Sequence, residues 1–146
     1  MRIYFSQVYI EPGVNYPFSH VFQQRMSAAV SDLVQASENF IRKFGNDWKV
    51  IFNVSAKKEI LAPEIVGPAV FKRTKDVEFT IFFPHDGTDA NQLADYTKPI
   101  RHLLLGAIGV LEKLKLDPTE LKKRIDSVVM ELSSDPTMFK RRRNWN

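Results

Sequence analysis

The sequence predicts an α+β protein in which a mainly antiparallel sheet of about four strands packs against helices. Three observations predict this class. The chain of 146 residues is long enough to enclose one core. Alternating apolar patterns and helical apolar patterns occur in the order β-α-β-β-β-α-α. Strands that follow one another closely along the chain favour antiparallel pairing, and the helices are segregated from them.

The first strand is predicted at residues 2–10, which are rich in aromatic and β-branched side chains. Ser19 is the candidate N-cap of a helix. Apolar residues then recur at helical spacing from Val21 to Phe44, and Gly45 ends the pattern. We therefore predict one long helix whose inward stripe is Phe22, Met26, Ala29, Leu33, Ser37, Phe40 and Phe44.

Three strands are predicted in the middle of the chain. Residues 48–55 and 76–84 alternate between apolar and other side chains, as strands with a buried face do. Residues 59–73 are apolar but are broken by two prolines and a glycine. Because proline cannot donate to a sheet ladder, this segment is predicted to be a kinked or bulged edge strand. The short connection at 74–76 predicts a hairpin between the last two strands.

A helical pattern continues over residues 90–116. Pro99 is expected either to kink this helix or to start a second one with Thr97 as its cap. The stretch 103–111 is apolar on nearly every side. We therefore expect this helix to be covered on more than one face.

The segment "DPTE" is the sharpest local signal in the chain. Asp117 is expected to cap a helix, Pro118 suits its first position, and Glu120 closes a capping box. This helix is predicted to end at about Ser133. The similar segment "DPTM" at 135–138 predicts at most one further turn.

A basic, mobile tail is predicted at 139–146, after a single domain at 1–138. The chain has 21 basic and 17 acidic residues, so the four consecutive basic residues 140–143 account for the whole excess of +4. A protein that follows a phosphate backbone usually carries positive charge across a folded face. Nucleic acid is therefore an unlikely partner on this reading.

Composition excludes several classes of protein. The absence of cysteine excludes a disulfide scaffold, a thiol nucleophile and a cysteine-ligated metal. The longest apolar run has nine residues, whereas a membrane-spanning helix needs about 20. The N-terminal residues lack the apolar core of a signal peptide. We expect a cytoplasmic protein with no membrane partner and, since no phosphate loop or metal motif occurs, no cofactor.

The segment "PHDGTDANQ" carries the most suggestive chemistry, because His85, Asp86 and Asp89 lie within five positions. A loop that gathered all three side chains would form a metal or catalytic site. A turn and a helix start account for the same residues: Asp86 and Gly87 make the turn, and Asp89 caps the helix. We favour the turn, and therefore predict no catalytic residue and no metal site.

The layout, with "FTIFFPHDG" as a strand and turn and "DPTELKKRI" as a helix start, resembles the immunity proteins of bacterial contact-dependent and related polymorphic toxin systems. This resemblance implies a non-catalytic module that binds a cognate toxin domain and neutralises it by occluding its active site. The expected contact residues are His85, Asp86, Asp89, Arg141, Arg142 and Arg143.

The alternative is a small enzyme or ligand-binding domain. Its pocket would lie between sheet and helices, with His85 and Asp86 at the mouth.

Overall fold

The structure, a computed structural model, describes residues 1–8, 16–85 and 96–140. It contains a four-stranded sheet and helices, which confirms the α+β class and the predicted succession of strand and helix segments, although two of the predicted helices are each divided. The elements are β1 (Arg2–Gln7), α1 (Phe22–Ser31), α2 (Glu38–Lys43), β2 (Lys49–Lys57), β3 (Glu64–Phe71), β4 (Asp76–Pro84), α3 (Thr97–Lys113), α4 (Thr119–Lys123), α5 (Ile125–Ser133) and the 3₁₀ turn η2 (Pro136–Met138).

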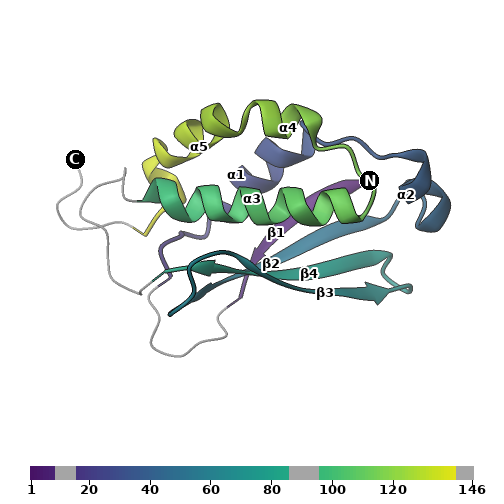
Figure 1. The fold of residues 1–146 in the computed structure, drawn as a ribbon, viewed down its shortest axis with the longest axis horizontal. Coiled ribbons are helices and arrows are strands. Elements are labelled where there is room, and N and C mark those ends of the chain that lie inside the picture. The colour runs from purple at the N-terminus through teal and green to yellow at the C-terminus, as the bar shows by residue number, and fades with distance from the viewer. Residues whose placement is uncertain (9–15, 86–95, 141–146) are drawn as a thin grey trace.

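The elements form layers, with the sheet at the bottom and the long helices above it (Figure 1). Helix α1 packs on β1, α3 packs on β3 and β4, and α5 packs on both α1 and α3. Helix α3 therefore lies between the sheet and α5, as its apolar circumference predicts. Its buried residues are Pro99, Ile100, Leu103, Leu104, Gly106, Ala107, Ile108, Val110 and Leu111.

The sheet is mixed, so the prediction of a mainly antiparallel sheet is wrong. Its strand order is β1-β2-β4-β3, with β1 parallel to β2, β2 parallel to β4, and β3 antiparallel to β4. Helices connect β1 to β2, and a helical crossover allows parallel pairing. Strand β4 returns from the β3 hairpin and enters between β2 and β3. The edge position of β3 is confirmed, with a register shift between Val66 and Ala69.

The two edges of the sheet differ in how their backbone groups are satisfied. Two serines of α1 close the β1 edge: Phe5 N–H donates to Ser27 Oγ at 3.0 Å, and Ser31 Oγ donates to the Ile3 carbonyl at 3.0 Å. Among the described residues, no side chain makes such a bond to the β3 backbone. The residues of β3 from Val66 to Phe71 are exposed, which distinguishes this edge from the β1 edge.

The predicted long first helix is wrong, because it is two helices, α1 and α2, separated at 32–37. Ser37, placed in the apolar stripe by its spacing, instead caps α2 by accepting a hydrogen bond from Phe40 N–H at 3.2 Å. The connecting backbone pairs elsewhere, since Asp117 N–H donates to the Gln35 carbonyl at 3.1 Å. Ser19 does not cap α1, which begins at Phe22.

The C-terminal helices follow the predicted signals with one interruption. The helix predicted after Asp117 ends at Ser133 as expected, but it is broken at Arg124 into α4 and α5. Asp117 accepts from Thr119 N–H at 3.0 Å, while Glu120 lies 3.5 Å from the Arg124 guanidinium and closes no capping box.

Pro99 lies in the first turn of α3, but the predicted cap is wrong: Thr97 is the first residue of the helix, and Tyr96 precedes it as the N-cap without a side-chain capping hydrogen bond. Residues 90–95 lie outside the described residues.

The fold continues past the predicted domain end at 138. Phe139 is only 2% exposed, and its ring stacks on Tyr96 with 4.2 Å between centroids. Ser19 N–H donates to the Met138 carbonyl at 2.8 Å, and Lys140 N–H donates to the Pro17 carbonyl at 2.9 Å. The C-terminal segment therefore contributes to the core as far as Phe139, and its backbone is bonded to the fold at Lys140.

Asp135 predicts a pH dependence of stability. Its carboxylate accepts hydrogen bonds from the Thr137 hydroxyl at 2.6 Å and the Thr137 N–H at 3.0 Å, and it lies 3.1 Å from Arg25 Nε. These contacts, the Thr137 hydroxyl first, lower the pKa of Asp135. The resulting stabilisation is complete above the unfolded pKa of about 3.9 and is lost as the pH falls through the folded pKa.

We expect the free energy of unfolding, measured by urea titration, to fall as the pH decreases below about 4, and Asp135→Asn to reduce this fall. Thr137→Val removes the hydroxyl donor, so it should also reduce this fall in the free energy of unfolding. An unchanged pH dependence in both variants would contradict the assignment.

Candidate protein-binding surface

The structure describes His85 alone among the six predicted contact residues. His85 lies directly beyond β4, where its N–H donates to the Lys57 carbonyl at 3.2 Å and its ring meets Phe83 edge-on at 6.2 Å. Asp86 and Asp89 lie outside the described residues, as do Arg141, Arg142 and Arg143. The interpretation of the His85 segment as a turn therefore stays a prediction.

The attachment points of the two predicted contact regions lie at one end of the molecule. His85 follows the end of β4, and Lys140 is bonded to the segment that precedes α1. The ring of Phe18 joins the two regions, because it lies 5.7 Å from the ring of Phe83 and 5.7 Å from that of Phe139. The structure thus brings together two regions, at His85 and at Lys140, that lie far apart in the sequence.

The described residues contain no cluster of side chains that could hold a metal ion. Within 1–8, 16–85 and 96–140, no three histidine, aspartate or glutamate side chains gather as ligands. The alternative reading requires a pocket with both His85 and Asp86 at its mouth, and Asp86 lies beyond the described part of the chain.

One face of the sheet carries no helix in the described structure (Figure 1). We call it the open face. Its polar groups are largely engaged with one another: Asn53 Nδ2 donates to Glu78 Oε1 at 3.0 Å, and Lys57 Nζ lies 2.7 Å from Glu64 Oε1. The Lys57 ammonium also lies 5.2 Å from the centre of the Phe82 ring. These contacts between strands hold the face in a defined shape.

Large apolar side chains are exposed on β3 and just before it. Leu61, before β3, is 97% exposed, and Val66, Val70 and Phe71 on β3 are 59%, 45% and 48% exposed. We call these four residues the β3 strip. Val66 and Phe71 share the open face with their partners in β4, whereas Val70 pairs with the core residue Val77 and remains exposed at the margin of the sheet.

The β3 strip includes none of the predicted contact residues. The sequence signal for it was indirect: the prolines within an apolar segment identified the edge strand, but apolar letters do not distinguish a buried strand from an exposed one. Large apolar side chains exposed on an edge strand are candidates for an interaction site.

No protein-family model, curated protein or solved structure matches this chain. None of the helices in its described ranges has the length and apolar character needed to cross a membrane. The resemblance to immunity proteins therefore remains a prediction.

Proposed function

We propose that this protein is a non-catalytic binding module that attaches to a partner protein through the β3 strip and the adjoining open face. The module acts as an immunity protein, which covers the active site of a cognate toxin domain. The exposure of the β3 strip is the observation that carries this proposal. A preformed apolar edge on a polar sheet face has the composition of an interface core with a polar rim.

The energetics favour the β3 strip as the anchor of such an interface. Covering exposed apolar surface contributes about 25 cal/mol per Å², so each large side chain of the strip adds on the order of 1 kcal/mol. Phe71 is an aromatic residue on a strand, and rigid aromatic anchors dominate many interfaces. The surrounding polar groups already have partners, so little reorganisation is needed on binding.

Neutralisation by covering needs no reactive group on this chain. A surface of ordinary interface size that includes the edge strand is enough to exclude substrate from the partner's active site. In this mechanism the present protein supplies only an interface. The catalytic residues belong to the toxin.

The first experiment uses the full chain as bait in an extract of the cells that encode it. Val66→Glu together with Phe71→Glu should abolish retention of the partner, because two carboxylates would then be buried against it. Leu105→Glu together with Met130→Glu is the matched control. These two side chains are 49% and 67% exposed on helices, so the control alters as much exposed apolar surface elsewhere.

The retained protein must also behave as a toxin. Its expression alone should arrest growth, and co-expression of the wild-type chain should restore growth. The Val66 and Phe71 double variant should fail to restore growth, while the Leu105 and Met130 double variant should succeed. Loss of protection by both variants, or by neither, would refute the β3 strip as the binding surface.

A further inference from the structure

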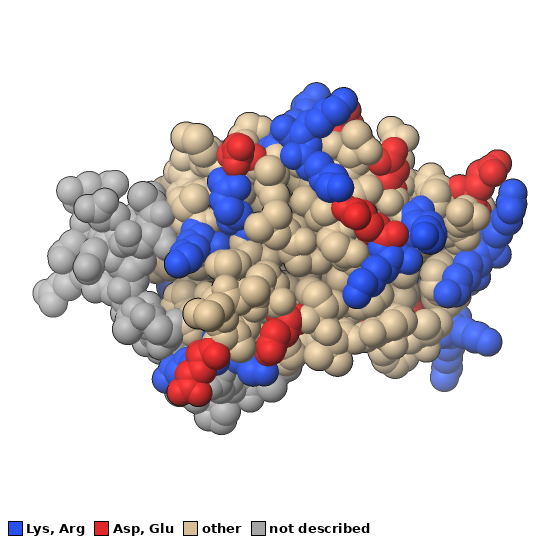
Figure 2. All heavy atoms as spheres, viewed as in Figure 1, with Lys and Arg blue, Asp and Glu red and all other residues tan. Residues whose placement is uncertain are grey.

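Positive charge gathers at the end of the sheet where β1, β2 and β4 begin, beside α2 and the β3–β4 turn (Figure 2). We call this region the basic end. It has seven basic and three acidic side chains: Arg2, Arg42, Lys43, Lys49, Lys72, Arg73 and Lys75 against Glu38, Asp47 and Asp76. The sequence alone assigns the excess positive charge to the tail. It does not reveal that basic residues distant in the sequence gather at this end of the fold.

Every acid of the basic end is already matched by a cation. Arg42 lies 3.4 Å from Glu38, Lys49 lies 3.2 Å from Asp76, and Lys75 bonds to Asp47. The matched pairs leave a surplus of four positive charges: Arg2, Lys43, Lys72 and Arg73.

The surplus cations are exposed and weakly engaged. Arg2 Nη1 lies 3.5 Å from the Tyr4 hydroxyl, and Lys43 Nζ lies 5.3 Å from the centre of the Phe44 ring. Lys72 and Arg73 are exposed at the β3–β4 turn. Neither contact supplies a negative charge, so the basic end retains its capacity to bind anionic groups.

The register of the sheet places two cations side by side. Arg2 lies directly opposite Lys49 in the β1–β2 pair, and Asp76 on the next strand matches one of them. Like charges directly opposite each other are unfavourable. A hollow of about 290 Å³ adjoins this pair and is lined by both cations, by Tyr4 and Trp48, and by Asp47, whose carboxylate is already bonded to Lys75. A partner carboxylate on the Arg2 and Lys49 side of the hollow would relieve the repulsion between these two cations.

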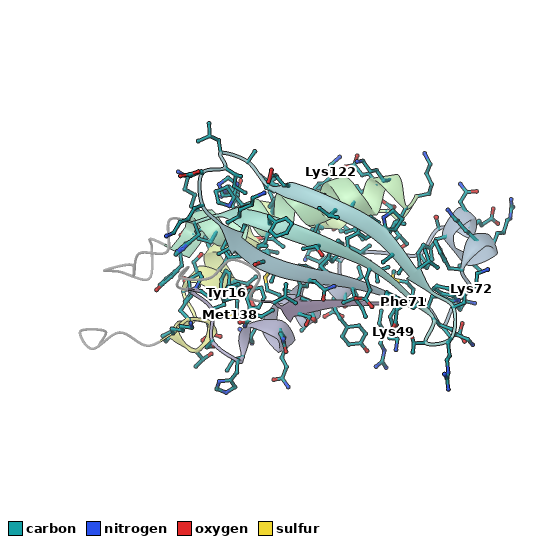
Figure 3. All side chains as sticks on the ribbon, turned by 90° about the horizontal axis from the view of Figure 1, so that it is seen from below. Tyr16, Lys49, Phe71, Lys72, Lys122 and Met138 are labelled. Atoms are coloured by element: carbon teal, nitrogen blue, oxygen red, sulfur yellow. The ribbon has the colours of Figure 1, made fainter. Side chains whose placement is uncertain are left out.

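The basic end is continuous with the β3 strip. Phe71 lies opposite Asp76, which lies opposite Lys49, so Phe71, Lys49 and Arg2 belong to one row across the open face. Figure 3, which views the molecule from below, shows Phe71, Lys49 and Lys72 at the same end of the sheet. Apolar and cationic groups therefore form one surface.

We propose that this surface binds an acidic segment of the partner protein. Its carboxylates meet Arg2 and Lys49 at the hollow and the cations at the β3–β4 turn, and its apolar side chains cover Phe71 and the β3 strip. The inference rests on the proposed function and specifies the partner's chemistry. A toxin domain neutralised in this way carries negative charge at the rim of its active site.

The composition of the surface favours a protein over a nucleic acid. Aliphatic Val66 and Val70 suit apolar side chains, whereas nucleic-acid sites use aromatic platforms for the bases. Glu64 and Glu78 lie on the same open face and would repel a phosphate backbone that extended across it. The surplus charge is confined to one end, which matches a short acidic segment.

The test measures binding of labelled probes to the full chain by fluorescence anisotropy. The probe is a short peptide in which glutamate alternates with valine, and the comparison peptide has lysine in place of glutamate. We expect the glutamate peptide alone to bind, and added salt to weaken it. Lys72→Glu together with Arg73→Glu should weaken its binding about tenfold, a difference of about 1.4 kcal/mol.

The matched control is Lys98→Glu together with Arg101→Glu, two basic residues near the start of α3, at the opposite end of the molecule from α2 (Figure 1), which should leave binding within about twofold of the wild type. Unfolding curves of both double variants verify that the fold is retained. Equal binding of the two peptides, equal effects of the two double variants, or no binding of the glutamate peptide would refute the acidic partner. The proposed partner would instead be a nucleic acid if a polythymidine strand bound more tightly than the glutamate peptide and the Lys72 and Arg73 double variant also weakened that binding.

The failure of this inference is distinguishable from failure of the proposed function. If the Val66 and Phe71 double variant loses protection against the toxin while the Lys72 and Arg73 double variant protects fully, the binding module stands and its partner is not acidic.

Discussion

Replacing Phe18 by alanine is expected to lower the free energy of unfolding by about 3–5 kcal/mol. Phe18 is 1% exposed, and its ring stacks on Phe22 with 4.2 Å between centroids. The same ring contacts Phe83 at the end of β4 and Phe139 in the C-terminal segment. The substitution therefore leaves a cavity where the first helix, the sheet and the C-terminal segment meet.

Urea titration monitored by circular dichroism measures this loss, and Phe71→Ala is the matched control. Phe71 is 48% exposed, so the same truncation there leaves no enclosed cavity and should cost less than about 1 kcal/mol. Similar losses at the two positions would show that Phe18 does not organise the core.

The sequence predicted the elements that local patterns define. The alternation at 76–84 predicted β4, and the prolines within 59–73 predicted an edge strand, because proline removes a backbone donor wherever it occurs. The segment at 135–138 predicted the single turn η2, where Asp135 accepts from Thr137 as the corresponding Asp117 accepts from Thr119. These features depend on neighbours within a few residues, so the sequence alone determines them.

The features that the sequence did not predict depend on distant residues. Parallel pairing of β2 with β4 requires β4 to enter between β2 and β3, an order that joins segments distant in the sequence. The break after α1 depends on Asp117, which pairs with Gln35 across more than half of the chain. The helical spacing of residues around Ser37 gives no sign that the backbone of Gln35 pairs with Asp117 instead of continuing the helix.

The candidate surface was predicted least well, for the same reason. Charge runs and polar clusters are visible in the sequence, so His85, Asp86 and the arginines of the tail were selected. The proximity of Arg2 and Lys49 appears only once the register of β1 and β2 is known. The exposure of Phe71 likewise depends on the place of β3 in the strand order of the sheet.

Replacing Gly67 by alanine is expected to lower the free energy of unfolding by about 2–4 kcal/mol. Gly67 has a φ of +133°, a conformation that residues with a Cβ rarely adopt. An added Cβ would lie 2.9 Å from the Glu78 carbonyl oxygen and 2.9 Å from Phe79 Cδ1. Since the carbonyl belongs to the neighbouring strand β4, relief of the contact requires β3 to move away from it.

Gly45→Ala separates the two causes of this loss. Gly45 also has a positive φ, of +106°, but an added Cβ would come no closer than 3.4 Å to a neighbouring side chain. It should therefore cost only the backbone strain, about 1–2 kcal/mol. Urea titration gives the two losses, and a larger loss at Gly45 than at Gly67 would refute the close approach of β3 to β4.

Gly67→Ala also connects the fold to the proposed binding surface. Amide hydrogen exchange should increase at Val66 and Ala69, the residues that flank the register shift, more than in the buried strand β2. Because displacement of β3 carries Val66 and Phe71 out of register with the open face, the variant should bind the glutamate peptide more weakly, whereas Gly45→Ala should bind it as the wild type does. Unchanged binding by a variant with a loosened β3 would show that the edge strand takes no part in recognition.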